Sequence, residues 1–261
     1  MIQEVCNYTE RIALACRLLL HLRSHNILSL HVLQDFSHYA ITSPINGFHS
    51  TKFPLWKLGY FLDEEWLQDE VLDGLAELAY FKAAASSGNT TLSRAPTFLY
   101  LPTSILREAR ALFSQTGGQE YGPNIEALRQ RIQSTTVTHI GFLDCKMNHY
   151  SAYLLTAFRQ LQHGDSLHRV PASDVLPILQ WILAGLETDS PRPATIEPGI
   201  MDLQGQGGGD GSCAVAAHNF IACAADPTLN RWTSPNSHEV RNQLLGELCV
   251  YHEVASKIEG V

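Results

Sequence analysis

A run of glycines that leads into an apolar segment is the feature that most limits how this 261-residue chain can fold. The stretch from Gly205 to Phe220 reads GQGGGDGSCAVAAHNF, so five glycines and one aspartate precede Cys213. Glycine allows backbone conformations that other residues avoid and lets the backbone approach another group closely. This stretch therefore predicts a loop that opens a buried helix, which continues from Ala214 to about Ala225 and has the cysteine in its first turn.

The spacing within this loop argues against phosphate binding. A P-loop requires GxxxxGK[ST], but no Lys or Arg lies between Pro193 and Asn230. In a dinucleotide-binding GxGxxG motif, Asp210 or Ser212 would stand where the third glycine belongs. A nucleophilic cysteine fits better, because a helix dipole stabilises a thiolate at its N-terminus and the preceding N–H groups can face an oxyanion.

Hydrophobic periodicity along the rest of the chain predicts an α+β domain built around a sheet and a central helix. Besides the helix after the glycines, helices are expected at 4–23, 63–82, from Thr103 or Ser104 onward, 124–133, 173–186 and 237–257. Strands are expected at 138–145, 149–158 and 200–204, with a turn-rich link at 162–171.

The net charge and the cysteine content indicate which cellular compartment and which class of partner to expect. The formal charge is −8 and no Lys/Arg-rich run occurs, so nucleic acid is not expected as the main partner. The six cysteines form no CxxC pair, which favours free thiols in a reducing, intracellular compartment over a zinc or thioredoxin site. The first apolar stretch is too short to cross a bilayer, so we expect a soluble protein without membrane association.

Residues upstream of the glycine loop could act together with Cys213. His149 and Tyr150 begin an apolar strand, Asp165 follows His149 by 16 residues, and Cys213 follows Asp165 by 48. With these distances the chain resembles the ubiquitin-like (SUMO) protease family, the adenain-like group of cysteine peptidases. Three further segments resemble parts of that family. Residues 66–78 look like its Trp-Leu-Asn-Asp helix, residues 98–105 look like its strand leading into a helix, and residues 138–155 look like its paired strands.

The resemblance covers about residues 60–255 and carries implications for fold and activity. It implies the papain-like, adenain-like fold: a central mixed sheet flanked by helices, with the nucleophile at the N-terminus of a central helix. Residues 1–59 would be a helical extension packed on a catalytic domain at 60–261. The implied activity is cleavage after the Gly-Gly tail of a ubiquitin-like modifier, from conjugates or a precursor, in the nucleus or cytoplasm. This chemistry requires no metal or organic cofactor.

The resemblance also assigns catalytic roles. Cys213 would attack the carbonyl carbon, His149 would take the thiol proton and deliver it to the leaving amine, and Asp165 would hold the imidazole tautomer. Gln206 would stabilise the oxyanion together with the backbone N–H of Cys213. Gln206 lies seven residues before the cysteine, whereas the family usually has six, and Ala214 follows the cysteine where glycine is common.

Three residues are expected to bind the substrate tail. Trp66 and Tyr150 would sandwich the Gly-Gly segment, with the tyrosine standing where the family commonly has tryptophan. Asp69 would meet a basic residue of the tail. His163 and His168 rank below His149 as the general base because they lie in the link rather than at the start of the strand.

Several alternatives remain open at this stage. Cys213 can be a small buried residue and Asp165 a turn cap. The whole chain can be a degenerate protease that only binds a ubiquitin-like modifier, or a deubiquitinase on the same fold. Acetyltransferases also use this fold but usually carry Glu at the position of Asp165. The identity of the modifier and the oligomeric state are not predicted.

Overall fold

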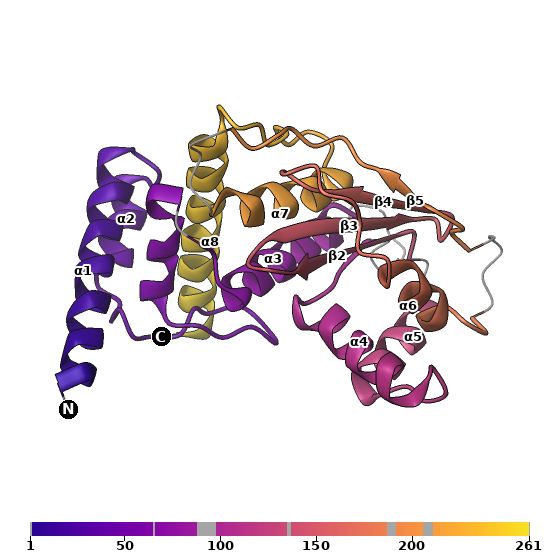
Figure 1. Ribbon diagram of the computed structural model, residues 1–261. Helices are drawn as coiled ribbons and strands as arrows, with labels where there is room; N and C mark the ends of the chain where they lie inside the picture. Colours follow the sequence, from indigo (N-terminus) through magenta and orange to yellow (C-terminus); the bar gives the residue numbers. More distant parts are fainter. Residues whose placement is uncertain are drawn as a thin grey trace.

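The computed structural model describes residues 2–64, 66–87, 98–134, 137–186, 192–205 and 211–260. It shows a mixed five-stranded sheet with helices on both faces (Figure 1). The helices are α1 Ile2–Ser24, α2 Leu30–Phe36, the 3-10 helix η1 Leu55–Glu64, α3 Asp69–Ser87, α4 Ser104–Thr116, α5 Pro123–Ser134, α6 Val175–Ile182, α7 Ser212–Ala225 and α8 Ser237–Glu259. The strands are β1 Phe98–Tyr100, β2 His139–Cys145, β3 Tyr150–Thr156, β4 Gln160–Gly164 and β5 Ile196–Pro198.

The strands lie side by side in chain order. The outer pairs, β1 with β2 and β4 with β5, are parallel, whereas β2, β3 and β4 form an antiparallel meander. The α+β class and the central mixed sheet predicted from the sequence are therefore confirmed. None of the described helices combines the length and the apolar composition that crossing a bilayer requires.

Several predicted boundaries are wrong. Strand β4 begins at Gln160 and extends to Gly164, into the turn-rich link expected at 162–171. Its polar sequence QLQHG has weak strand propensity, but its ladder with β3 fixes it as a strand. The strand expected at 200–204 is absent, and β5 lies just before it. Pro198, which has no N–H to donate, ends that strand. The predicted helix 63–82 begins only at Asp69 and runs to Ser87, and the predicted helix 173–186 shortens to α6. Helices α2 and η1 were not predicted.

The two faces of the sheet carry two separate cores, because neighbouring residues of a strand point to opposite sides. Leu143, Tyr150 and Ala152 pack with α3, α7 and α8 on one face. Phe142 and Tyr153 stack at 5.3 Å on the other face, within the core that α4, α5 and α6 cover. Figure 1 shows α7 lying along the first face, so this helix is buried between the sheet and α8.

Close contact between β2 and α7 depends on a glycine. A Cβ added to Gly141 would lie 2.2 Å from Cγ2 of Ile221. We expect Gly141→Ala to destabilise the protein by about 1–3 kcal/mol because the helix must move away from the strand. Urea unfolding measures this cost. In an Ile221→Ala background the same substitution should cost much less, and an equal cost in both backgrounds would contradict the packing explanation.

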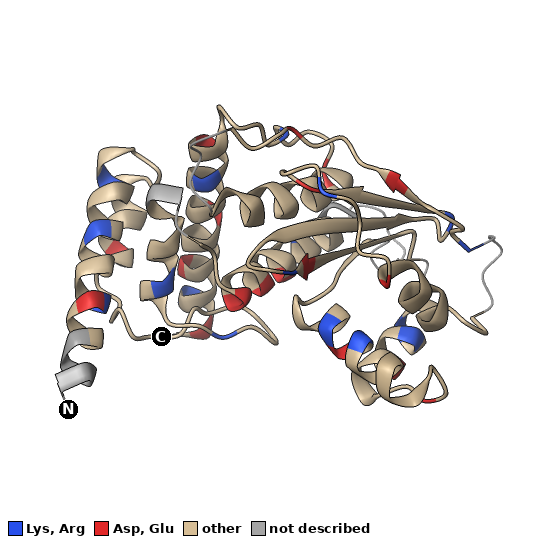
Figure 2. Ribbon diagram, viewed as in Figure 1, with Lys and Arg blue, Asp and Glu red and all other residues tan. Residues whose placement is uncertain are grey.

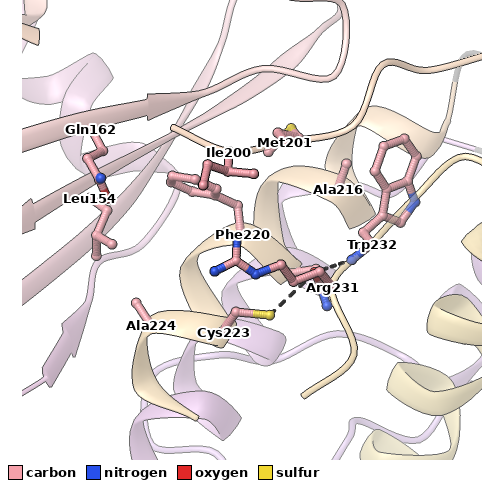
Figure 3. A pocket seen from close by; sticks show the side chains of 11 residues that line it. Leu154, Gln162, Ile200, Met201, Ala216, Phe220, Cys223, Ala224, Arg231 and Trp232 are labelled. Atoms are coloured by element: carbon pink, nitrogen blue, oxygen red, sulfur yellow. Dashed lines mark hydrogen bonds between the residues drawn. The ribbon is translucent and has the colours of Figure 1, made fainter. Parts of the chain in front are cut away.

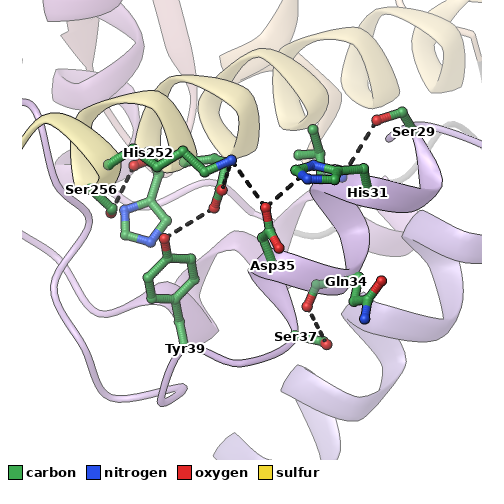
Figure 4. Close-up of polar contacts among 11 residues, drawn as sticks. Ser29, His31, Gln34, Asp35, Ser37, Tyr39, His252 and Ser256 are labelled. Atoms are coloured by element: carbon green, nitrogen blue, oxygen red, sulfur yellow. Dashed lines mark hydrogen bonds and ion pairs between the residues drawn. The ribbon is translucent and has the colours of Figure 1, made fainter. Parts of the chain in front are cut away.

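The N-terminal helices belong to the first core. Buried residues of α1, η1 and the segments around α2 pack in one cluster with α3, α7 and α8. Polar contacts join α2 to α8 as well (Figure 4). Lys257 lies 3.0 Å from Asp35 and 2.8 Å from Glu253, and the Tyr39 hydroxyl donates to Glu253 at 3.0 Å. The division of the chain at residue 59 remains a prediction.

Candidate active site

His149 and Asp165 meet at one end of the sheet. The histidine comes directly before β3 and the aspartate directly after β4, and these strands are antiparallel neighbours. His149 Nε2 lies 3.0 Å from Asp165 Oδ1, and both residues are buried. Cys213 is the second residue of α7 and is 1% exposed. Three of the four predicted catalytic residues therefore lie at the same end of the sheet and the central helix.

A tight hairpin fixes the position of His149. Met147 and Asn148 both have positive φ, 50° and 53°, which is the conformation of a two-residue type I′ turn. The hairpin is closed by two backbone hydrogen bonds between Lys146 and His149, of 2.9 and 3.2 Å. Because turn type sets the register of the paired strands, the imidazole emerges at a defined point beside Asp165.

The carboxylate of Asp165 is held from its own backbone. Oδ1 accepts the N–H of Leu167 at 2.7 Å in addition to the imidazole of His149. An aspartate that accepts a backbone N–H two residues on forms an Asx turn, which orients the carboxylate. Asp165 thus both caps this turn, as the plainer alternative expected, and faces the histidine.

The interactions between His149 and Asp165 favour the protonated, imidazolium form of His149. Burial opposes the charge of His149, but the hydrogen bonds with Asp165 and Cys213 outweigh burial and raise its pKa to about 9. Burial likewise opposes the charge of Asp165, yet the hydrogen bonds from His149 and Leu167 lower the pKa of the carboxyl group. With Nε2 directed at the aspartate, Nδ1 is the ring nitrogen left to exchange a proton with the thiol of Cys213. Such a group can stabilise a thiolate and later protonate a leaving amine.

The described part of the segment before α7 ends at Gly205 and resumes at Gly211. Gln206, the predicted oxyanion donor, lies outside the described residues. Its neighbour Gln204 is anchored beside the pair: its backbone N–H donates to the carbonyl of Ser166 at 2.7 Å, and the Ser166 hydroxyl donates to its side chain at 3.3 Å. Cys213 lies in the first helical turn, where backbone N–H groups point out along the helix axis.

Trp66 and Tyr150 lie against each other. Their ring centroids are 5.0 Å apart at an interplanar angle of 32°. A peptide chain between two flat rings needs a separation of roughly 7–8 Å, twice the usual contact distance of carbon atoms. The two predicted walls of the tail channel therefore touch in this structure, and a tail can pass only when they separate.

Asp69 is engaged within the protein. The buried hydroxyl of Tyr150 donates to its Oδ1, and Arg107 lies 3.6 Å from its Oδ2. A basic substrate residue would have to compete with Arg107, whose side chain is 72% exposed. Sequence reasoning missed this arginine because α4, which carries it, comes near α3 only in the folded chain.

The two lower-ranked histidines lie outside the pair. The ring of His163 packs on Tyr153 with centroids 4.8 Å apart, and burial lowers the pKa of this imidazole. His168 has its Nε2 3.0 Å from the carbonyl of Met201. Within the described ranges no three His, Cys, Asp or Glu side chains gather as metal ligands would.

Comparison with known proteins supports the fold. The catalytic domain of a Chaetomium thermophilum Ulp1-like SUMO protease superposes with a TM-score of 0.63 at 14% identity, covering 85% of this chain and 90% of that one. The C-terminal Ulp1 protease domain, solved in complex with Smt3, the yeast ortholog of SUMO, gives 0.59 at 12% identity, with coverage of 85% and 94%. No protein-family profile and no curated protein sequence matches the chain. At this level of identity the likeness concerns the fold, and it confirms the predicted one: the chain has the adenain-like cysteine peptidase fold of the Ulp1-like SUMO proteases.

Proposed function

We propose that the protein is a cysteine peptidase that cleaves after the Gly-Gly tail of a ubiquitin-like modifier. The observation that carries this proposal is the buried hydrogen bond of 3.0 Å between His149 and Asp165, with Cys213 at the start of α7 coupled to the same imidazole. An apolar core histidine without such a role would have its pKa lowered by burial, as His218 does, to about 3.

The mechanism proceeds by acyl transfer to the cysteine. The Cys213 thiolate attacks the carbonyl carbon of the terminal glycine, and the carbonyl oxygen becomes an oxyanion facing the first turn of α7. The backbone N–H of Cys213 is one hydrogen-bond donor to this oxyanion, and the side chain of Gln206 is the other. The imidazolium of His149 then protonates the leaving amine as the C–N bond breaks and a thioester forms. Water, deprotonated by His149, attacks the thioester and releases the modifier while Asp165 keeps the ring oriented.

The touching rings of Trp66 and Tyr150 support a glycine tail as the substrate. If they separate only as far as a peptide backbone requires, two consecutive glycines fit between them where residues with side chains do not. The complex of the structurally similar Ulp1 domain with Smt3 supports a ubiquitin-like modifier as the partner. The free thiols support an intracellular site of action, nuclear or cytoplasmic, where thiolate chemistry is protected from oxidation.

Modifier probes that end in a vinyl sulfone test the proposal. We expect a SUMO probe to form a covalent adduct at Cys213, identified by mass spectrometry, and Cys213→Ala to abolish the adduct. Cys223→Ala is the matched control and should react as the unchanged protein does. Capture by a ubiquitin probe instead would identify a deubiquitinase. Binding without an adduct would identify a degenerate binding module and contradict the proposed reaction.

A further inference from the structure

A cavity that the proposed reaction does not use lies along α7, two to three turns beyond the nucleophile. Its volume is about 170 Å³. Ala216, Phe220 and Cys223 of α7 form one wall, and Ile200 and Met201, from the segment after β5, form the opposite one (Figure 3). At ~1.5 Å of rise per residue, Phe220 and Cys223 are roughly 10–15 Å along the helix from Cys213. We call this the α7 cavity.

The size and the walls of the α7 cavity suit one apolar side chain. An apolar cavity of roughly 150 Å³ in another protein holds a benzene molecule, so this one can hold an aromatic ring or a leucine side chain. Leu154 and Trp232 add apolar surface to the walls, and Gln162 and Asn219 are polar residues of the lining. Ile200 is 79% exposed, so apolar surface continues outward onto the rim.

An exposed arginine, Arg231, lines the cavity. No described residue forms a hydrogen bond or ion pair with its guanidinium. In Figure 3 its side chain runs between Phe220 and Cys223. Consistent with that position, burial raises the pKa of Cys223 and the charge of Arg231 opposes the shift.

Carboxylates in the same region are already engaged. Asp226 accepts from the N–H and the hydroxyl of Thr228 at 3.0 and 2.6 Å. Asp202 accepts the N–H of Ser234 at 2.9 Å. A planar guanidinium prefers a carboxylate with two acceptor oxygens, and within the described part of the chain none is offered to Arg231. A carboxylate that pairs with Arg231 would therefore have to come from a binding partner.

We propose that the α7 cavity binds a protein segment in which a phenylalanine or leucine stands next to an aspartate or glutamate. The apolar side chain fills the cavity, the carboxylate pairs with Arg231, and the rest of the segment lies on Ile200. Charge complementarity selects this occupant: a neutral segment leaves the guanidinium unpaired, and a basic one is repelled by it. Neither contact involves Cys213, which is not part of the cavity lining, so binding does not depend on peptidase activity.

Four short peptides that differ at two positions test the proposal on the intact protein. They carry Phe-Glu, Phe-Gln, Ala-Glu or Phe-Lys in the same glycine-serine context. We expect the Phe-Glu peptide to bind in calorimetry, and the other three to bind at least about tenfold more weakly, the loss that one charge-assisted hydrogen bond or one buried ring represents. Bound Phe-Glu peptide should also slow alkylation of Cys223, measured by mass spectrometry separately from Cys213.

Three variants locate the contact. Arg231→Gln should make the Phe-Glu and Phe-Gln peptides bind equally. Ala224→Leu, which fills the cavity from its lining, should abolish binding and is checked for folding by circular dichroism. Arg159→Gln removes an exposed arginine next to β4 and should change nothing. The proposal is overturned if the Phe-Glu peptide does not bind, if the Phe-Lys peptide binds equally well, or if Arg159→Gln weakens binding as much as Arg231→Gln.

Discussion

Asp165→Asn is expected to lower kcat/KM for a Gly-Gly tail substrate by about 10³–10⁴-fold, the loss that follows when a triad histidine loses its carboxylate. The hydrogen bond with Asp165 is the largest single contribution that raises the pKa of His149, which reaches about 9. An asparagine in its place removes that charge and can present its NH₂ group to Nε2, which favours the wrong tautomer. The measurement is steady-state cleavage of a modifier fused to a fluorogenic amine.

The pH profile distinguishes a catalytic role from a structural one. In the unchanged protein the imidazolium is present below pH 9, so activity that requires it should be lost as the pH rises through about 9. In Asp165→Asn this alkaline limb should move to lower pH, because the pKa of His149 falls. Asp174→Asn, which removes a carboxylate paired with Arg110, is the control and should keep the limb in place. An unmoved limb in Asp165→Asn would contradict the assignment of this residue.

Deletion of residues 1–59 is expected to leave a chain that does not fold. Eight side chains from this segment are buried in the core shared with α3, α7 and α8: Leu18, Leu22, Leu28, Phe36, Ile45, Phe53, Leu55 and Leu58. Burying one such side chain contributes about 1.5–3 kcal/mol, whereas a whole domain is stable by only about 5–15 kcal/mol. The fragment 60–261 should therefore show no cooperative unfolding transition in urea, followed by circular dichroism.

Two point variants calibrate this expectation. Leu22→Ala, at a position with 0% exposure, should cost about 2–5 kcal/mol of unfolding free energy. Leu30→Ala, at a position 81% exposed, should change it by no more than about 0.5 kcal/mol. A fragment 60–261 with the same urea midpoint as the full chain would show that the segment is a dispensable extension.

The secondary structure could be predicted where periodicity was strong. The strands β2 and β3 are apolar and flank a two-residue turn, so local pattern and tertiary pairing agree. The strand β4 could not be found in this way, because QLQHG is polar and becomes a strand only by pairing with β3 on one side and β5 on the other. The strand expected at 200–204 was wrong for the opposite reason. Its first residues are apolar, but no described strand lies beside this segment to pair with it.

The candidate site could be predicted as far as the order of residues along the chain allows. His149, Asp165 and Cys213 were proposed from the family resemblance that their order and spacing suggest, and the structure brings the first two into contact. The closed contact between Trp66 and Tyr150 could not be predicted, because it depends on the relative position of β3 and the segment that leads into α3. The bond of the tyrosine hydroxyl to Asp69 arises from the same packing.

The contact between Trp66 and Tyr150 has a consequence for how the protein would choose among substrates. If most molecules have the rings together, the affinity for any tail is reduced by the fraction of molecules in which they are apart. A free Gly-Gly peptide makes few other contacts and cannot offset that reduction, whereas a folded modifier binds over a wide surface and can. Discrimination would then rest on the body of the modifier, and the many proteins that merely expose two glycines would remain uncut at the concentrations found in a cell.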